Sequence, residues 1–372
     1  MFPRIASAVV VVAVAAALAL VGWPQVFGLE HTIGFAQLVA FRALFVVGAT
    51  PATLALIIVI AALRRRHPAI VALLVIVALF GVANTGLLAV RGWSPSPAST
   101  PASTPAAAPS NSPRGTTITV LTWNTLGGAV DAQTIAQLAL AVKADVITLP
   151  ETTEATATEV TALLAAAGTP MWSHTVSLDE STGTRSTSLL ISTALGAYEP
   201  TDEFGNTSRL PSVVARPVKG VGPVIAAVHP VAPVPGEMSN WRRDLDWIST
   251  LCRTPNLVVG GDFNATLDHV TSLQQCSDTA LAAHTAAVGT WPTSLPPFLS
   301  APIDHVMHTS SWATVSARVI DSEDAAGSDH RPFVAVLAPV PRPHPHPHRP
   351  HRPHRPHPES RRPDASETME YG

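Results

Sequence analysis

Charge is scarce in this chain, and lysine is nearly missing. Only 13% of the 372 residues are charged, while 47% are hydrophobic and the mean hydropathy is +0.27. This composition is too apolar for an ordinary soluble protein and indicates membrane segments. The only lysines are Lys143 and Lys219, and the net charge is −3. Because nucleic acids are held through many cationic contacts to phosphates, the sequence argues against strong nucleic-acid binding.

Several catalytic signatures are also missing. The chain has no G-x-S-x-G turn of a serine hydrolase, no Walker loop for nucleotide phosphates and no H-E-x-x-H zinc helix. These absences argue against the three enzyme classes that depend on those motifs.

Three uncharged apolar runs lie in the first hundred residues: Ile5–Val21, Ala43–Leu63 and Ala69–Val90. Each is close to the roughly 20 residues that a helix needs to cross a bilayer. The basic stretch Arg64–His67 follows the second run, and loops rich in Lys and Arg stay in the cytoplasm. We therefore expect a cytoplasmic N-terminus, three crossings and an extracellular location for everything after Arg91. A cleaved signal peptide is the alternative for the first run, and it would leave the basic loop inside.

Cysteine occurs twice, at Cys252 and Cys276, and both positions fall in the part expected outside the cytoplasm. An even pair in an oxidising compartment favours a disulfide. Two buried free thiols are the alternative, because the sequence does not show whether the two Cα atoms come within bonding reach.

The chain divides by composition into four parts. Residues 1–91 form the membrane domain, and residues 92–114, rich in Pro, Ser and Thr, predict an extended linker. Residues 115–340 are long enough for one globular core. Residues 341–372 form a His-, Pro- and Arg-rich tail, in which frequent proline prevents helix and sheet. Its six histidines, from His344 to His357, are interpreted either as part of a solvated disordered tail or as a contact for divalent metal or an acidic surface.

Apolar runs typical of strands alternate with helical patterns in the globular part. The strands outnumber the helices, and the helices interleave with them only in part. This order predicts an α/β domain of packed layers with at least one mixed sheet, rather than a doubly wound parallel sheet. The strand patterns are TTITVLTWNT, DVITLPE, TSLLIS, SVVARPV, GPVIAAVHP, NLVVGGDF, IDHVMH and FVAVLAP, and the helical patterns are DAQTIAQLALAVKA, ETTEATATEVTALLAAAG and SNWRRDLDWISTLC.

Acids, amides and imidazoles recur where these strands begin or end. Turns favour Asn and Asp for purely structural reasons, but a shared sheet edge would bring all six places together. Such a group is rich in oxygen and free of sulfur, which suits Mg²⁺, Mn²⁺ or Ca²⁺ rather than structural zinc. A metal ion with an oriented histidine is the equipment for hydrolysing a phosphate ester. The residues are Asn124, Glu151, His229, Asp262 with Asn264, Asp304, and Asp329 with His330.

These residues resemble a known family, the endonuclease/exonuclease/phosphatase superfamily of deoxyribonuclease I-like enzymes. The resemblance covers nearly all of residues 117–338, and the Ala- and Pro-rich, Lys-poor composition suggests a membrane-anchored bacterial member. It depends most on the GDFN and SDHRP blocks, and Pro150 stands where the family more often has Gln. The resemblance implies a four-layered α/β sandwich, in which two mixed β-sheets pack face to face with helices outside. The matching segments are VLTWNTLGG, ITLPET, SRLPSVVARP, AVHPVAP, GGDFNAT, PIDHVM and GSDHRPFVAVL.

The resemblance also implies a metal site and a proton-transfer pair. Glu151 would be the main metal ligand, assisted by Asn124 and Asp329. Mg²⁺ is the expected ion, with Mn²⁺ or Ca²⁺ as alternatives. His330 would act as the general base on the attacking water, and Asp304 would orient it.

The remaining implied roles concern the phosphate and the leaving group. Asp262 and Asn264 would position the nucleophile and the phosphate, and Asp262 is also a candidate for handling a proton. His229 would bind the phosphate or act as the acid for the leaving oxygen. Arg209 would be a supporting cation near the site.

The expected protein is a membrane-anchored, extracytoplasmic, metal-dependent phosphoesterase that hydrolyses phosphodiester or phosphomonoester bonds. The substrate is open among nucleic acid, phospholipid and a small phosphodiester, and no protein partner is inferred. The expected location is the cell membrane, with several crossings and an extracellular catalytic domain. The alternative is a catalytically inactive cell-surface binding domain of the same fold. That alternative would be marked by loss of Glu151, Asp262 or His330, and all three are present.

Overall fold

The computed structural model describes residues 2–63, 67–93, 117–179, 183–270, 273 and 275–341, with side chains from residue 5 onward. The chain divides into two compact units, Met1–Val340 and Pro341–Gly372. Apart from residues 92, 93 and 341, the predicted linker and the predicted tail lie outside the described residues. Both therefore stay predictions.

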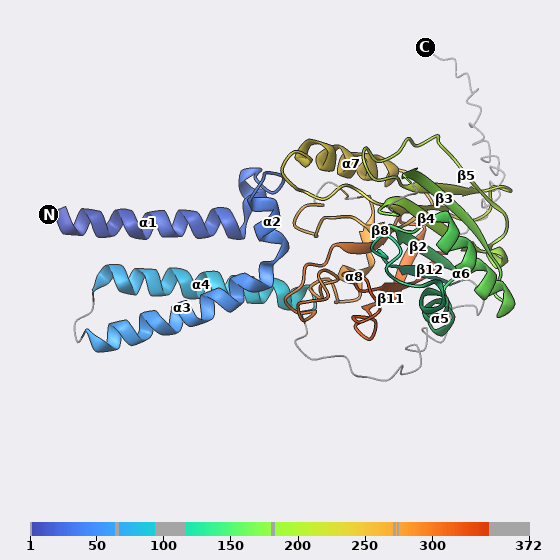
Figure 1. Ribbon diagram of the computed structural model, residues 1–372. Helices are drawn as coiled ribbons and strands as arrows, with labels where there is room; N and C mark the ends of the chain where they lie inside the picture. Colours follow the sequence, from blue (N-terminus) through green and yellow to red (C-terminus); the bar gives the residue numbers. More distant parts are fainter. Residues whose placement is uncertain are drawn as a thin grey trace, which may run out of the picture. The chain divides into compact units, whose positions relative to one another are not determined.

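Three long apolar helices, α1 (Phe2–Gly22), α3 (Arg42–Ala62) and α4 (Pro68–Val90), precede the globular part (Figure 1). Each is long and apolar enough to cross a membrane, which confirms the prediction of three long apolar helices at the N-terminus. Proline opens α4 at its first position, where no backbone N–H is needed. A 3₁₀ turn, η1 (Pro24–Phe27), and a short helix, α2 (Phe35–Ala40), connect α1 to α3.

Within the described residues, the strands of the globular part form two six-stranded mixed sheets. The first sheet has the order β11-β12-β1-β2-β4-β3, and the second has the order β5-β6-β7-β8-β10-β9. The strand bounds are β1 Ile118–Thr122, β2 Val146–Pro150, β3 Met171–Asp179, β4 Arg185–Ser192, β5 Tyr198–Pro200, β6 Val213–Pro217, β7 Val224–Val228, β8 Leu257–Asp262, β9 Ser277–Asp278, β10 Asp304–His308, β11 Trp312–Val319 and β12 Phe333–Pro339.

The strands of the two sheets pair in the same way. This pairing gives the sandwich one edge that is formed by strand ends. Each sheet has a parallel pair near its centre, β1 with β2 and β7 with β8. An antiparallel neighbour begins where each of these pairs ends, so Phe333 of β12 lies opposite Thr122 and Asp304 of β10 lies opposite Asp262. The carboxyl ends of four strands and the amino ends of two others therefore meet at one edge of the sandwich.

Helices cover the outer faces of both sheets (Figure 1). Between the sheets, Val120 of β1 and Ile225 of β7 belong to one continuous apolar cluster. The helices α5 (Ala132–Val142) and α6 (Glu154–Ala166) pack on the first sheet, and α7 (Met238–Leu251) packs on the second. Two short pieces, η2 (Thr193–Leu195) and α8 (Thr279–Ala282), complete the element order. The predicted four-layered α/β sandwich is confirmed.

Close approach of the chain segments explains the glycine pair in the VVGGDF stretch. A Cβ atom on Gly260 would lie 3.0 Å from Oγ1 of Thr148, which belongs to the opposite sheet. A Cβ atom on Gly261 would lie 2.0 Å from the carbonyl oxygen of Val228 on the neighbouring strand, and its φ of +153° is one that L side chains rarely adopt. The two glycines thus allow β8 to run close to both neighbours and to end at Asp262.

A disulfide joins Cys252, at the end of α7, to Cys276, with their Cα atoms 5.4 Å apart. This confirms the predicted pairing over the alternative of two free thiols. The bond closes a loop of 24 positions, which is worth about 3 kcal/mol in the chain-entropy model. The disulfide ties the segment after β8 to the helix that covers the second sheet.

Candidate active site

The predicted site residues lie at or close to the ends of strands. Asn124 lies just beyond β1, Glu151 follows β2 directly, and His229 follows β7 directly. Asp262 is the last residue of β8, and Asp304 is the first residue of β10. Since these ends share one edge of the sandwich, residues from distant parts of the sequence become neighbours.

Asn124 is the hydrogen-bonding centre of the site. Its Nδ2 donates to Oε1 of Glu151 at 3.0 Å and to Oδ2 of Asp262 at 3.1 Å. Its Oδ1 accepts from the backbone N–H of Leu126 at 3.0 Å, so the nitrogen end of the amide faces the two carboxylates. Asn124 is buried, and the amide links a carboxylate of each sheet.

His330 is held through both its ring and its backbone. Its Nδ1 lies 2.9 Å from Oδ2 of the buried Asp304, and we assign the Nδ1 proton to this hydrogen bond. The other nitrogen, Nε2, then faces Oδ2 of Asp262 at 3.7 Å and Oδ1 of Asp329 at 4.0 Å. Nε1 of Trp123 donates to the carbonyl oxygen of His330 at 2.9 Å and fixes the backbone.

A second histidine and a second amide also lie close to Asp262. Nε2 of His229 is 3.8 Å from Oδ2 of Asp262 and 3.9 Å from Oε1 of Glu151. The backbone N–H of Asn264 donates to Oδ1 of Asp262 at 2.8 Å, and its Nδ2 donates to the carbonyl oxygen of Pro230 at 3.0 Å. Together with Asn124 and His330, which adjoin strands of the first sheet, these two residues surround Asp262 from both sheets.

Two residues of the site have a strained backbone. The angle φ is +55° at Glu151 and +45° at Asn264, in the left-handed region that residues other than glycine rarely adopt. Such strain costs about 1–3 kcal/mol and persists where the surroundings hold the residue firmly. Here the side-chain hydrogen bonds of the two residues, to Asn124 and to the carbonyl oxygen of Pro230, hold them in place.

Burial and mutual charge shift the pKa values of four groups in the site. Burial raises the pKa of Asp262 to about 7 and also raises the pKa of Glu151. Burial lowers the pKa of His229 to about 3, and the charge of His330 adds to this effect. Burial would also lower the pKa of His330, but the carboxylates of Asp304 and Asp262 outweigh it and raise that pKa to about 10. Carboxylates thus outnumber the protonated histidine that faces them.

This arrangement fits a divalent cation. Asp262, Asp304 and His330 each offer one ligand atom, and the three atoms lie within 4.8 Å of one another. Oδ1 of Asp304 and Oδ1 of Asp329 are buried and have no hydrogen-bond partner among the described residues. Unpartnered carboxylate oxygens are the ligands that Mg²⁺, Mn²⁺ and Ca²⁺ prefer. A cation would also offset the excess negative charge.

The three metal ligands implied by the resemblance are Glu151, Asn124 and Asp329. They differ from the group of Asp262, Asp304 and His330. Asn124 presents its nitrogen rather than its oxygen to Glu151 and Asp262. As a ligand, it would have to share Oδ1 with the N–H of Leu126. Glu151 and Asp329 keep carboxylate oxygens at the more open side of the site, where their side chains are 17% and 42% exposed.

The structure brings eight of the nine predicted site residues together, whereas Arg209 pairs with a residue outside this group. The side chain of Arg209 is 58% exposed, and its Nε lies 3.5 Å from Oε2 of Glu237. In the described part of the chain, no hydrogen bond or ion pair joins Arg209 to the other eight. Those eight are Asn124, Glu151, His229, Asp262, Asn264, Asp304, Asp329 and His330.

Two further contributors were not predicted. Nε1 of Trp291 donates to Oδ2 of Asp329 at 2.8 Å, and its ring centre lies 6.4 Å from that of His330. Oγ of Ser328 accepts from the backbone N–H of His330 at 3.0 Å. Ser328 belongs to the GSDHRP block that carried the resemblance, so its neighbours gave a signal. Trp291 lies in a loop without a recognised motif, and no sequence pattern pointed to it.

A family model matches residues 121–330, which is more than half of this chain, and its description is the endonuclease/exonuclease/phosphatase family. The chain belongs to this family. The matched range contains all eight residues of the cluster. Members of the endonuclease/exonuclease/phosphatase family are typically metal-dependent hydrolases of phosphoester bonds, and this member carries an acidic group with histidine that fits a divalent ion.

Several solved structures are similar to this family member. An endonuclease/exonuclease/phosphatase from Beutenbergia cavernae DSM 12333 is 20% identical, with a TM-score of 0.45, over 60% of this chain and 72% of that chain. D. rerio TDP2 complexed with single strand DNA product is 16% identical, with a TM-score of 0.47, over 59% and 98% of the two chains. A family protein from Bacteroides vulgatus is 16% identical, with a TM-score of 0.43, over 60% and 100%. Among the curated proteins, none matches this sequence.

Proposed function

We propose that this chain is a membrane-anchored, metal-dependent phosphoesterase whose catalytic domain lies outside the cytoplasm. Its reaction is the hydrolysis of phosphodiester or phosphomonoester bonds. One observation carries the proposal: the His330–Asp304 pair faces Asp262 at the edge where strand ends of both sheets meet. The outward location depends on the basic stretch Arg64–His67 between the second and third apolar runs, because such loops stay in the cytoplasm.

Glu151 and Asp329 hold the ion in this proposal. Both carboxylates lie on the open side of the site, and Asp329 has an unpartnered Oδ1. Asn124 keeps Glu151 in position through its Nδ2. Mg²⁺ is the expected ion, because it uses one or two protein carboxylates and leaves positions for substrate phosphate. When bound, a divalent cation supplies positive charge that neutralises phosphoryl oxygens.

His330 is the proton acceptor for the attacking water in this proposal. Its pKa of about 10 belongs to the site without a cation, and it would fall once positive charge at the site offsets the carboxylates of Asp304 and Asp262. Because the Nδ1 proton is held by Asp304, the proton can be taken up only at Nε2. Nε2 lies 3.7 Å from Oδ2 of Asp262, which is too long for a hydrogen bond. One oxygen atom of water or phosphate can contact both groups across that distance.

His229 and Asn264 bind the phosphate beside Asp262 in this proposal. The pKa of about 3 leaves His229 neutral at neutral pH, so it can donate a hydrogen bond without carrying a charge. A role as acid for the leaving oxygen would require a protonated ring, which burial opposes. Phosphate binding is therefore the better of its two assignments, and Arg209 keeps only its predicted role as a nearby cation.

The test uses the purified full chain in detergent micelles and bis-p-nitrophenyl phosphate as substrate, with Mg²⁺ and with EDTA. We expect turnover that depends on Mg²⁺ and is lost in His330→Ala. The matched variant His174→Ala, which replaces a histidine on edge strand β3, should keep it. No turnover with any divalent ion would favour the inactive binding domain. Equal turnover in both variants would remove His330 from the mechanism.

A further inference from the structure

Three segments of the globular domain contact the membrane part, and all three adjoin the site. Residues 229–237 follow β7, residues 263–270 follow β8, and residues 283–303 precede β10. Each of these segments adjoins a strand end that carries site residues. In the first segment, the carbonyl oxygen of Pro233 accepts a hydrogen bond from Nε2 of Gln37, in the connector between α1 and α3.

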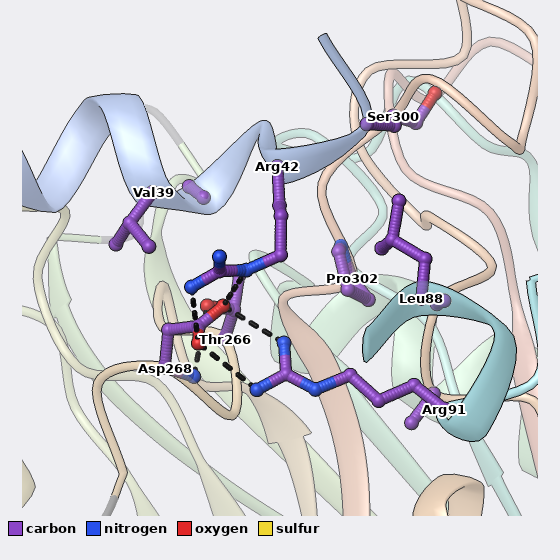
Figure 2. A pocket seen from close by; sticks show the side chains of 12 residues that line it. Val39, Arg42, Leu88, Arg91, Thr266, Asp268, Ser300 and Pro302 are labelled. Carbon is purple, nitrogen blue, oxygen red and sulfur yellow. Dashed lines mark hydrogen bonds and ion pairs between the residues drawn. The ribbon is translucent and has the colours of Figure 1, made fainter. Parts of the chain in front are cut away.

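Asp268 joins the second segment to the ends of two membrane helices (Figure 2). Its carboxylate accepts hydrogen bonds of 2.8 and 3.1 Å from Arg42, the first residue of α3. It accepts two more, of 2.8 and 2.9 Å, from Arg91, directly after α4. Nε2 of Gln25 adds a bond of 2.9 Å. The side chains of Asp268 and Arg42 are 4% and 3% exposed, so this ion-pair group is buried.

A second contact lies next to this ion-pair group. The carbonyl oxygen of His269 is 2.8 Å from Nε2 of His31, and Nε2 of His269 is 3.0 Å from the carbonyl oxygen of Ala36. Ala36 is fully buried against the apolar cluster under α7. The connector therefore packs into the domain rather than touching it only through charges.

The third contact reaches the site itself. The ring of Phe41, at the end of the connector, lies 5.9 Å from the ring of Trp291. Trp291 donates to Asp329 at 2.8 Å and lies 6.4 Å from the ring of His330. A single tryptophan thus separates a membrane-segment residue from two residues of the catalytic cluster.

A three-crossing arrangement would place the contacting residues at the level of the membrane surface. In a three-crossing arrangement, the end of α1, the start of α3 and the end of α4 are on one side of the bilayer, and the connector and Arg91 are there as well. The connector exposes large apolar side chains, which suit the boundary between headgroups and acyl chains. Those side chains are Val26, Phe27, Ile33 and Leu38.

We propose that the catalytic edge faces the bilayer that anchors the protein, and that the substrate is the phosphodiester headgroup of a lipid in that same bilayer. This inference rests on the proposed function. Two residues of the site stay partly exposed while the membrane part is docked, because the side chains of Asp329 and Glu151 are 42% and 17% exposed in the whole chain. A headgroup phosphate at the membrane surface needs only to reach Asp329 and Glu151.

The charges near the site favour a lipid over a nucleic acid. Strands of nucleic acid are bound through free cations that replace their counterions. Arg42 and Arg91, the cations at the docking contact, are both bonded to Asp268 and are not free for phosphates. The domain has only two lysines, Lys143 and Lys219.

The orientation is tested first, without any activity. Val234, in the segment after His229, and Val221, in the turn before β7, are exposed and lie at opposite ends of that strand. Each is replaced in turn by cysteine in the full chain and labelled with a thiol-reactive dye, since both native cysteines are in the disulfide. In phosphatidylcholine vesicles with a headgroup-linked nitroxide, Val234→Cys should be quenched more strongly than Val221→Cys. Equal quenching, or stronger quenching at 221, overturns the orientation.

Activity is then measured with the full chain in vesicles of phosphatidylcholine and phosphatidylglycerol. We expect lipid in the same vesicles to be cleaved at least about tenfold faster than lipid in added protein-free vesicles, because confinement raises its effective concentration. Equal rates, or a preference for a DNA oligonucleotide, overturn the lipid assignment. If bis-p-nitrophenyl phosphate is cleaved and lipid is not, the inference fails while the proposed function stands. If neither is cleaved, both fail.

Discussion

Replacing Asp268 by asparagine should loosen the catalytic domain from the membrane segment without unfolding either part. The substitution keeps the shape of the side chain and removes its charge, which leaves Arg42 and Arg91 without a counter-charge. The side chain of Arg42 is 3% exposed and cannot turn to water, whereas that of Arg91 is 15% exposed. Breaking a buried pair by removing one partner costs about 3–5 kcal/mol. The carbonyl oxygen of Gly22 and Oδ1 of Asn84 still accept from Arg42, so we expect a value near the lower limit.

The assay severs the covalent link and measures what remains. A site for a specific protease is inserted into the predicted linker, the full chain is reconstituted in vesicles, and the linker is cut. Sedimentation at several protein concentrations then gives the affinity of the domain for the membrane segment. A loss of about 3 kcal/mol corresponds to roughly a hundredfold weaker affinity. The matched control is Asp246→Asn, which makes the same chemical change at an exposed position of α7 and should have no effect.

Two results would contradict this prediction. If Asp268→Asn is retained as tightly as the unaltered protein, the ion-pair group does not hold the interface. If the unaltered domain leaves the vesicles as soon as the linker is cut, the docked arrangement does not exist in solution. Salt provides a further check, because buried pairs are little screened. Retention of the unaltered domain should therefore change little between low and moderate ionic strength.

Three further predictions concern the site. Asp304→Asn should lower kcat by about 10²–10⁴-fold, because His330 loses the group that orients it, and an unchanged kcat would contradict this role. Glu151→Gln should raise the Mg²⁺ concentration for half-maximal activity by at least about tenfold, while Glu154→Gln at the start of α6 should not, as a metal titration will show. In EDTA, the folded-state pKa of Asp262, about 7, exceeds its unfolded value of about 3.9, so the folded state binds more protons between these values. Stability should therefore fall as pH rises from about 4 to 7, and Asp262→Asn should reduce this fall in thermal unfolding scans.

Sequence reasoning predicts the inner strands of both sheets and misses the edges. All eight predicted strands have neighbours on two sides, and the four that escaped prediction, β3, β5, β9 and β11, are the edge strands. Inner strands are buried on both faces and read as continuous apolar runs. The strand β2, VITLP, is buried at every position, whereas β3, MWSHTVSLD, has no fully buried residue. An edge strand is specified by its neighbour, which a local pattern does not contain.

The site could be predicted in part for a similar reason. Asn124, Glu151 and Asp262 stand where apolar runs stop, and a strand end at the edge of a sheet is a position that sequence can locate. Trp291 reaches the site only through the course of a long loop, so its role follows from tertiary packing. The contact between the domain and the apolar helices is harder still to predict from the sequence, because Asp268 lies 226 positions from one of its arginine partners. No periodicity or motif links residues that far apart.

The segment from Asp262 to His269 connects the candidate site to the contact with the apolar helices. It starts at Asp262 of the candidate site and ends in the contact with the apolar helices, and between them Phe263 and Ala265 are fully buried. The backbone N–H of Thr266 donates to Nδ1 of His269 at 2.9 Å, so the segment is folded onto itself. If docking serves to present lipid to the site, Asp268→Asn should reduce turnover of lipid in the same vesicles much more than turnover of bis-p-nitrophenyl phosphate. A small soluble diester reaches the site whether or not the domain is docked. Equal loss on both substrates would mean that Asp268 supports the conformation of this segment, and through it Asp262, rather than the position of the domain on the membrane.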